Sequence, residues 1–152
     1  MFVKAGRLSV WHSRHVEIDA CTSLDLMARS LEAVADAGID IVPRFYSQLF
    51  SLYPEQQANF HDRASSRGTM VNDMVAMLLA QAEGADWVSM IIRAQVATHH
   101  DHGDIALEHY RGALHLLVDV LAEAAGPAWD DAQERAWRRQ AVQLFDLIAR
   151  FY

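Results

Sequence analysis

Two adjacent histidines in the second half of the chain are the residues whose placement most suggests chemistry. On a predicted helix, His100 ends an apolar stripe of three aliphatic residues spaced by four. These residues are Val88, Ile92 and Val96. His99 lies almost as well on the same face. A neutral imidazole in this position can ligate iron. The stripe also fits a histidine that is simply packed at the edge of a core, so on its own it leaves both interpretations open.

Further histidines surround this pair. His102, His109 and His115 follow His99 and His100 along the chain, which raises the question of a zinc site. Adjacent residues of a helix point about 100° apart, and the spacing matches no strong zinc signature. We therefore favour an iron or a packing role for the pair over zinc.

The elements that must position these residues are predicted to be helices. From residue 22 onward, apolar residues recur at intervals of three or four, which is the helical period, and glycines and prolines mark the breaks. The methionines at 70, 74, 77 and 90 are interpreted as packing residues. The predicted helices cover about residues 22–38, 42–50, 54–60, 65–81, 88–100, 106–125 and 129–152. The fold class is therefore all-α, with six or seven helices and short joints.

Residues 1–21 differ from the rest of the chain. The stretches FV, LSVW and HVEI are rich in β-prone residues and are separated by polar or glycine positions. We interpret residues 1–21 as an N-terminal extension with weak strand character and residues 22–152 as a single domain.

Composition excludes several classes of protein. The chain has 152 residues, of which 52% are hydrophobic, so it can form one domain with a substantial core. Its net charge is −7, and its densest basic group, Arg135, Arg138 and Arg139, lies beside acidic residues. We expect binding neither to nucleic acid nor to an anionic membrane. A single cysteine, no secretory signal and no apolar run of about 20 residues predict a soluble, cytoplasmic protein.

Three stretches read together carry a more specific signal. The first is FYSQLFSLYPEQQANF (45–60), with an aromatic pair, Leu-Phe, Pro-Glu and a final phenylalanine. The second is THHDHG (98–103) followed by EHY (108–110), and the third is AW (136–137). In this order and spacing, the sequence resembles the bacterial single-domain globins and the haem domain of flavohaemoglobins over about residues 22–151.

This resemblance implies a globin fold of six to eight helices enclosing haem b. His100 would be the proximal iron ligand, because it lies ten residues before Tyr110, and His99 is the alternative at a shift of one residue. Phe60 would pack against the porphyrin, and Tyr46 would stand in the distal pocket. There its hydroxyl could donate a hydrogen bond to a bound gas molecule. Tyr110 and Val96 are also expected to contact the cofactor.

The distal side departs from the family pattern. The position usually held by glutamine or histidine falls near Arg67, with Ser66 and Met70 as alternatives if the joint differs in length. Arg67 could point toward a haem propionate or donate to a ligand. Val71 and Met74 are expected to form the apolar distal wall.

The proximal side departs as well. Flavohaemoglobins place a glutamate in the last helix, linked through the tyrosine to the proximal histidine, and that position falls at Tyr152. A bond from Tyr110 to His100 remains expected. Without the carboxylate, less electron density is pushed onto iron, which favours reversible ligand binding over peroxidase-like O–O cleavage.

The resemblance implies binding of O2, NO or CO, as in oxygen binding and transport. It also implies nitric oxide dioxygenation, for which we expect a separate electron-donating reductase, since no reductase domain follows in this sequence. The alternative is a haem-based gas or redox sensor, or an interaction module, in which residues 1–21 add to a partner or pair across a dimer. A haem-free globin-fold regulator is a third hypothesis. Monomer and homodimer both remain open.

Overall fold

The structure is a computed structural model that describes the backbone of residues 9–60, 64–103 and 105–152. Side chains are described from Ser23 onward, except those of residues 61–66, 102 and 104. The elements, in chain order, are α1 (Ser9–Ala37), α2 (Ile41–Leu52), the 3₁₀ helix η1 (Pro54–Asn59), α3 (Ala64–Glu83), α4 (Val88–His102), α5 (Leu107–Ala125), the 3₁₀ helix η2 (Gly126–Ala128) and α6 (Asp131–Phe151). No strand occurs in these ranges, and the predicted all-α class is confirmed.

The helix boundaries follow from local chemistry. The carboxylate of Asp40 accepts from the Val42 amide at 3.0 Å and begins α2, and Pro54 stands in the first turn of η1. A reciprocal capping box between Asp130 and Gln133 begins α6. These positions agree with the breaks predicted from the sequence.

The first helix corrects one prediction. The weak strand character expected for residues 1–21 is wrong from Ser9 onward, because this stretch is the first half of α1. No glycine or proline interrupts Ser9–Ala37, and β-branched residues lower helix propensity by only about 0.7 kcal/mol at most. The helix ends at Gly38, whose φ of 66° suits glycine. Residues 1–8 lie outside the described part, and the domain boundary at residue 21 stays a prediction.

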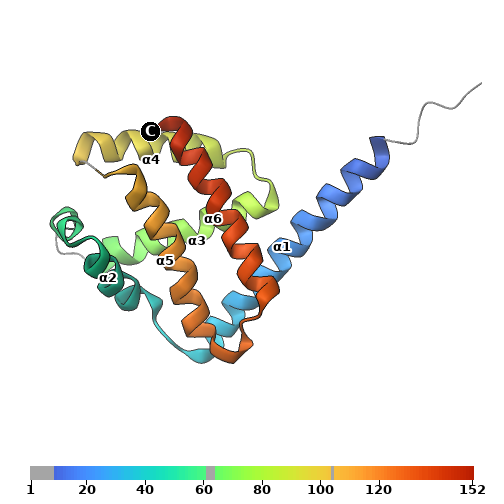
Figure 1. Ribbon diagram of the computed structural model, residues 1–152, viewed down its shortest axis with the longest axis horizontal. Coiled ribbons are helices and arrows are strands. Elements are labelled where there is room, and N and C mark those ends of the chain that lie inside the picture. The colour runs from blue at the N-terminus through green and yellow to red at the C-terminus, as the bar shows by residue number, and fades with distance from the viewer. Residues whose placement is uncertain (1–8, 61–63, 104) are drawn as a thin grey trace, which may run out of the picture.

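The helices pack around an antiparallel pair. Figure 1 shows α5 and α6 side by side, with α4 crossing next to the end of α6. Helix α1 packs on α3, α5 and α6, and α2 packs on α5. Trp137 of α6 is fully buried in this core. Its indole Nε1 donates to Ser30 Oγ of α1 at 2.7 Å, and Ser30 in turn donates to the Met27 carbonyl at 2.6 Å.

The buried hydrogen bond between Trp137 and Ser30 yields a first prediction. Ser30→Ala leaves the indole N–H without this acceptor, so we expect a loss of about 1–3 kcal/mol in the free energy of unfolding. Denaturant unfolding followed by far-UV circular dichroism measures the loss. The control is Ser51→Ala on the exposed face of α2, which should change stability by less than about 0.5 kcal/mol. Equal effects of the two substitutions would contradict the importance of the buried bond.

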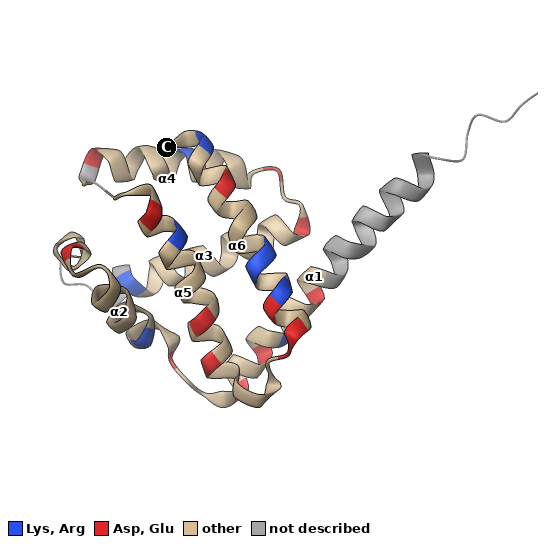
Figure 2. Cartoon of the chain, viewed as in Figure 1, with Lys and Arg blue, Asp and Glu red and all other residues tan. Residues whose placement is uncertain are grey.

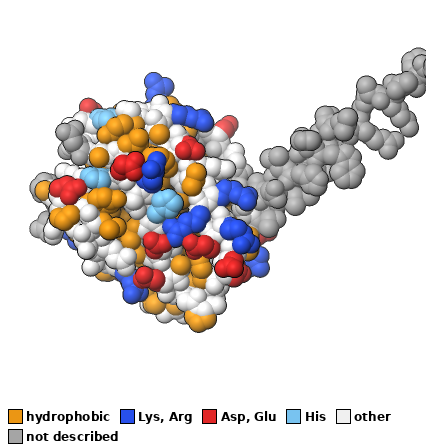
Figure 3. All heavy atoms as spheres, in the orientation of Figure 1, with side chains coloured by type: hydrophobic (Ala, Val, Ile, Leu, Met, Phe, Trp, Pro, Cys, Tyr) orange, Lys and Arg blue, Asp and Glu red, His pale blue; other side chains and the backbone are white. Residues whose placement is uncertain are grey.

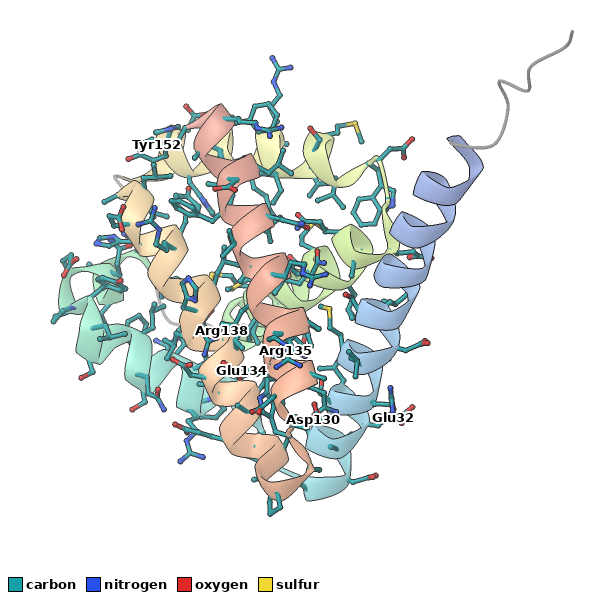
Figure 4. All side chains as sticks on the ribbon, turned by 45° about the vertical axis from the view of Figure 1, so that its right-hand side comes forward. Glu32, Asp130, Glu134, Arg135, Arg138 and Tyr152 are labelled. Carbon is teal, nitrogen blue, oxygen red and sulfur yellow. The ribbon has the colours of Figure 1, made fainter. Side chains whose placement is uncertain are left out.

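Charged residues of both signs are mixed on the surface. Figure 2 shows acidic and basic positions close together along α6, and Figure 3 shows the two signs interspersed with apolar side chains on the face in view. Arg138 is half-buried, pairs with Glu134 at 2.7 Å and also pairs with Asp119 of α5 (Figure 4). Arg44 of α2 pairs with Glu123 of α5 at 3.0 Å. In the ranges that the structure describes, no helix combines the length and apolar character needed to span a membrane.

Candidate functional site

A cavity of about 560 Å³ opens between helices α2 to α6 and η1. This volume falls in the range of about 300–1,000 Å³ that is usual for sites of small molecules and cofactors. Most of the side chains around it are apolar. They include Leu49, Phe60, Ile92, Val96, Leu114 and Ile148. A mostly apolar cavity lined by a few polar groups suits a ligand with a large apolar surface.

His99 brings an imidazole to this cavity from α4. The side chain is half-buried, lines the cavity and holds its Nδ1 at 2.7 Å from the hydroxyl oxygen of Tyr110. Tyr110 of α5 also lines the cavity. A hydrogen bond at Nδ1 fixes the orientation of the ring, and it makes Nε2 the atom that a metal would use.

His100 is placed differently. It is exposed, does not line the cavity, and its ring centroid lies 4.9 Å from that of Tyr152. Tyr152 lies at the end of α6 in Figure 4, and its hydroxyl donates to the Ile105 carbonyl at 3.1 Å. The two adjacent side chains point about 100° apart on the helix, and in this structure His99 is the one that lines the cavity. The structure brings His99 there, and not the His100 that the sequence count favoured.

The phenol of Tyr110 stays protonated at neutral pH. Burial raises the pKa of Tyr110 to about 12, and the nearby Tyr152 acts in the same direction. The group that orients His99 is therefore an uncharged hydroxyl, which exerts a weaker pull on the imidazole proton than a carboxylate would.

Phe60 and Tyr46 lie in one aromatic cluster, but only Phe60 reaches the cavity. The ring centroid of Tyr46 lies 5.2 Å from that of Phe60 and 5.5 Å from that of Phe50. Tyr46 is 2% exposed, and its hydroxyl donates to the backbone carbonyl of Arg67 at 3.1 Å. A hydroxyl has one proton to donate. In this arrangement Tyr46 therefore does not present a donor to a ligand in the cavity, in contrast to its expected distal role.

Arg67 and Val71 also stand away from the cavity. The guanidinium of Arg67 lies over the rings of Tyr46 at 5.4 Å and Phe50 at 5.3 Å, and its Nε is buried without a hydrogen-bond partner among the described residues. Val71 is fully buried in the core. Of the residues expected on the distal side, Met74 does line the cavity.

The wall formed by α3 holds residues that the sequence analysis did not assign to the site. Thr69, Met70, Asp73 and Met77 line the cavity beside Met74. Met70 had been only an alternative to Arg67. Helical spacing from Met74 identifies Met70 and Met77 as members of the same face, and this signal was available in the sequence.

A polar wall closes another side of the cavity. Gln56 is 5% exposed and bonds through Nε2 to His109 Nδ1 at 3.0 Å, while its Oε1 accepts from Asn59 at 2.9 Å. His109 Nε2 lies 3.2 Å from Glu55. The ring centroids of Tyr53 and His109 lie 4.4 Å apart. These contacts join η1 to α5 and hold the cavity wall in one conformation.

Tyr53 owes its position to a glycine. A Cβ atom on Gly112 of α5 would lie 2.8 Å from Tyr53 Cζ and closer still to the hydroxyl. The absence of a side chain at 112 therefore lets the phenol ring lie against α5, with its edge in the cavity wall.

The site suits a haem group better than a bare metal ion. Within the described ranges, no group of three or more His, Cys, Asp or Glu side chains could hold a metal ion. The imidazole of His99, oriented by Tyr110 in a mostly apolar cavity that Phe60 also lines, matches the needs of an iron porphyrin, which supplies the other ligands itself.

Comparison with known proteins finds two similar sequences. No family model matches the chain. A flavohemoprotein of Vibrio cholerae serotype O1 is 25% identical over 116 residues, which are 75% of this chain and 29% of that protein. A flavohemoprotein of Bacillus cereus is 25% identical over 118 residues, 72% of this chain and 29% of that protein. The chain thus spans less than a third of the length of these relatives. Its sequence is similar to the haem domain of flavohaemoglobins, and its all-α architecture agrees with the globin fold.

Proposed function

We propose that the cavity holds haem b, that His99 is its axial ligand, and that the protein binds a diatomic gas there. The observation that carries this proposal is the pairing of His99 with Tyr110 inside an apolar cavity of about 560 Å³. The similarity to two flavohemoproteins supports it, since their name denotes a haem protein.

Each lining group has a defined task in this proposal. His99 would ligate through Nε2 and donate its Nδ1 proton to the Tyr110 hydroxyl, which would hold the ring in the orientation that ligation needs. The apolar side chains of Ile92 and Val96, which are 3% and 2% exposed, and that of Phe60 would contact the porphyrin and exclude water. When bound, the haem supplies the iron that binds O2, NO or CO and exchanges electrons.

We propose reversible gas binding as the activity of this site. The phenol of Tyr110 beside His99 Nδ1 has a pKa of about 12 and stays neutral. A neutral hydrogen-bond partner would add less negative charge to an iron-ligating imidazole than a carboxylate would.

We further propose that the protein converts nitric oxide to nitrate. This conversion needs a supply of electrons, and the name of both relatives denotes a flavin as well as a haem. We therefore propose a flavin-containing reductase as the electron donor, in the same or in another polypeptide. Nitrate formation from NO and O2, with and without such a reductase, distinguishes turnover from gas sensing.

Absorption spectroscopy tests the proposed function directly. The protein is reconstituted with haem, and spectra are recorded in the ferric, ferrous and CO forms, with haem content measured per chain. We expect one haem per chain and a shift of the Soret band on addition of CO. The proposal would be refuted if the protein did not retain haem, or if the bound haem did not bind CO, NO or O2.

The hydroxyl of Tyr110 yields a second prediction. Tyr110→Phe keeps the ring but removes the oxygen 2.7 Å from His99 Nδ1. We expect a loss of about 10- to 100-fold in haem affinity, which is usual when a partner of a metal-ligating histidine is removed. Competitive haem transfer to an acceptor protein measures this loss. Tyr152→Phe serves as the control, because that hydroxyl donates to the Ile105 carbonyl. The same loss in both variants would argue against a specific role of Tyr110.

A further inference from the structure

Three methionines form a row on the α3 side of the cavity. Met70, Met74 and Met77 stand at i, i+4 and i+7 of the helix, and all three line the cavity. Met77 is 8% exposed, whereas Met70 and Met74 are only partly buried. The latter two thus have the freer access to the cavity space.

The imidazole of His99 enters the same cavity from α4. Helices α3 and α4 both pack on α6, contact each other, and each contributes side chains to the cavity lining. A flat group bound between these side chains would meet the imidazole on one face and the methionine row on the other.

The row offers a donor that suits haem iron. A thioether sulfur is a soft ligand, and a His/Met axial pair is known from cytochromes, where it raises the reduction potential. The other polar lining groups of α3 are the hydroxyl of Thr69 and the carboxylate of Asp73, which are hard oxygen donors. Tyr46 directs its hydroxyl to the Arg67 carbonyl. Methionine is therefore the soft donor on this wall.

Contacts at the start of α3 single out Met70. The ring centroids of Phe60 and Tyr46 lie 5.2 Å apart. The hydroxyl of Tyr46 in turn donates a hydrogen bond to the backbone carbonyl of Arg67 at 3.1 Å. Met70 follows Arg67 by about one turn of α3, and Met70 and Phe60 both line the cavity. Met74 lies a further turn along the helix.

We propose that, when no gas is bound, the sulfur of Met70 ligates the haem iron opposite His99. This proposal rests on the proposed haem function. It makes the resting protein six-coordinate and low-spin, and a gas must displace the thioether before it binds. If the displaced state makes up about 1–10% of the population, removal of the sulfur should raise the rate of CO binding about 10- to 100-fold.

Matched methionine variants test the assignment. Haem-loaded wild type, Met70→Leu and Met74→Leu are compared, because leucine keeps the apolar volume and the substitution usually costs less than about 1.5 kcal/mol. Haem content, electron paramagnetic resonance of the ferric form, the long-wavelength charge-transfer band of thioether-ligated haem and the CO-binding rate are measured. Circular dichroism checks that each variant is folded.

The expected results separate this proposal from the proposed function. Wild type and Met74→Leu should be low-spin with the thioether band. Met70→Leu should keep its haem, lose the band, become high-spin and bind CO about 10- to 100-fold faster. A high-spin wild type, an unchanged Met70→Leu, or loss of the band in Met74→Leu instead would overturn the assignment while leaving the haem function intact. Absence of haem from the wild type would overturn both.

Discussion

His99→Ala is expected to weaken haem binding by more than about 100-fold, whereas His100→Ala should bind haem like the wild type. The reason is that His99 lines the cavity and pairs with Tyr110, while His100 is exposed beside Tyr152. The loss should exceed the 10- to 100-fold that removal of an outer partner of a metal ligand typically costs, because the ligand itself is removed.

Haem titration and the ferrous spectrum of the two variants measure the difference. Added imidazole should restore the coordination of the His99→Ala protein, because the free ring can enter the space that the side chain vacates. His100→Ala is the matched control, since it removes the same ring from the neighbouring residue of the same helix. Loss of haem in His100→Ala, with retention in His99→Ala, would return the ligand to the residue that the sequence count indicated.

The largest effect on stability is expected from Trp137→Ala. The side chain is fully buried in the core and donates a hydrogen bond to Ser30. Truncation of a large buried aromatic side chain costs about 3–5 kcal/mol, because it removes apolar contacts and leaves a cavity. For a chain of this size, that loss lowers Tm by roughly 6–20 °C.

Trp87 provides the matched control for this stability prediction. It stands just before α4 and is 44% exposed, so Trp87→Ala should cost much less than Trp137→Ala. Calorimetry of both variants without haem gives the comparison, so that differences in cofactor binding do not contribute. Equal Tm shifts would mean that the core around Trp137 tolerates truncation, contrary to its close packing.

Local chemistry made much of the fold predictable. Proline or glycine stands at most of the helix breaks, and the apolar periodicity from residue 22 onward gave the helices α2 to α6 close to their observed bounds. The N-terminal half of α1 was not predicted, because valine, isoleucine and tryptophan between Ser9 and Cys21 indicated weak strand character. Continuity with the rest of α1, which no local propensity reveals, decides their conformation.

The inward-facing histidine could not be chosen from the sequence. His99 and His100 stand three and four residues after Val96, and both spacings lie on the same helical face. The choice depends on how α4 rotates against α5 and on the joint between them. Counting ten residues back from Tyr110 assumes the length that this joint has in the globins that the sequence resembles, whereas here the hydrogen bond spans eleven residues.

The residues on the distal side were also predicted by counting along the chain across a joint between helices. Counting from Phe60 put the distal position near Arg67, with its side chain directed to a haem propionate or to a ligand, but the guanidinium lies over the rings of Tyr46 and Phe50. The hydrogen bond from Tyr46 to the Arg67 carbonyl is a contact with backbone. Side-chain patterns carry no information about such a contact, so it could not be foreseen.

Gly112 of α5 does not line the cavity, but the residue at this position affects the shape of the cavity through Tyr53. Any larger residue at this position must push the Tyr53 ring away from α5, since a Cβ would lie 2.8 Å from its Cζ atom. Gly112 is not itself part of the cavity wall, but Tyr53 is. Variation at a single glycine would thus change the shape of the cavity wall at Tyr53 without any substitution among the residues that line the cavity.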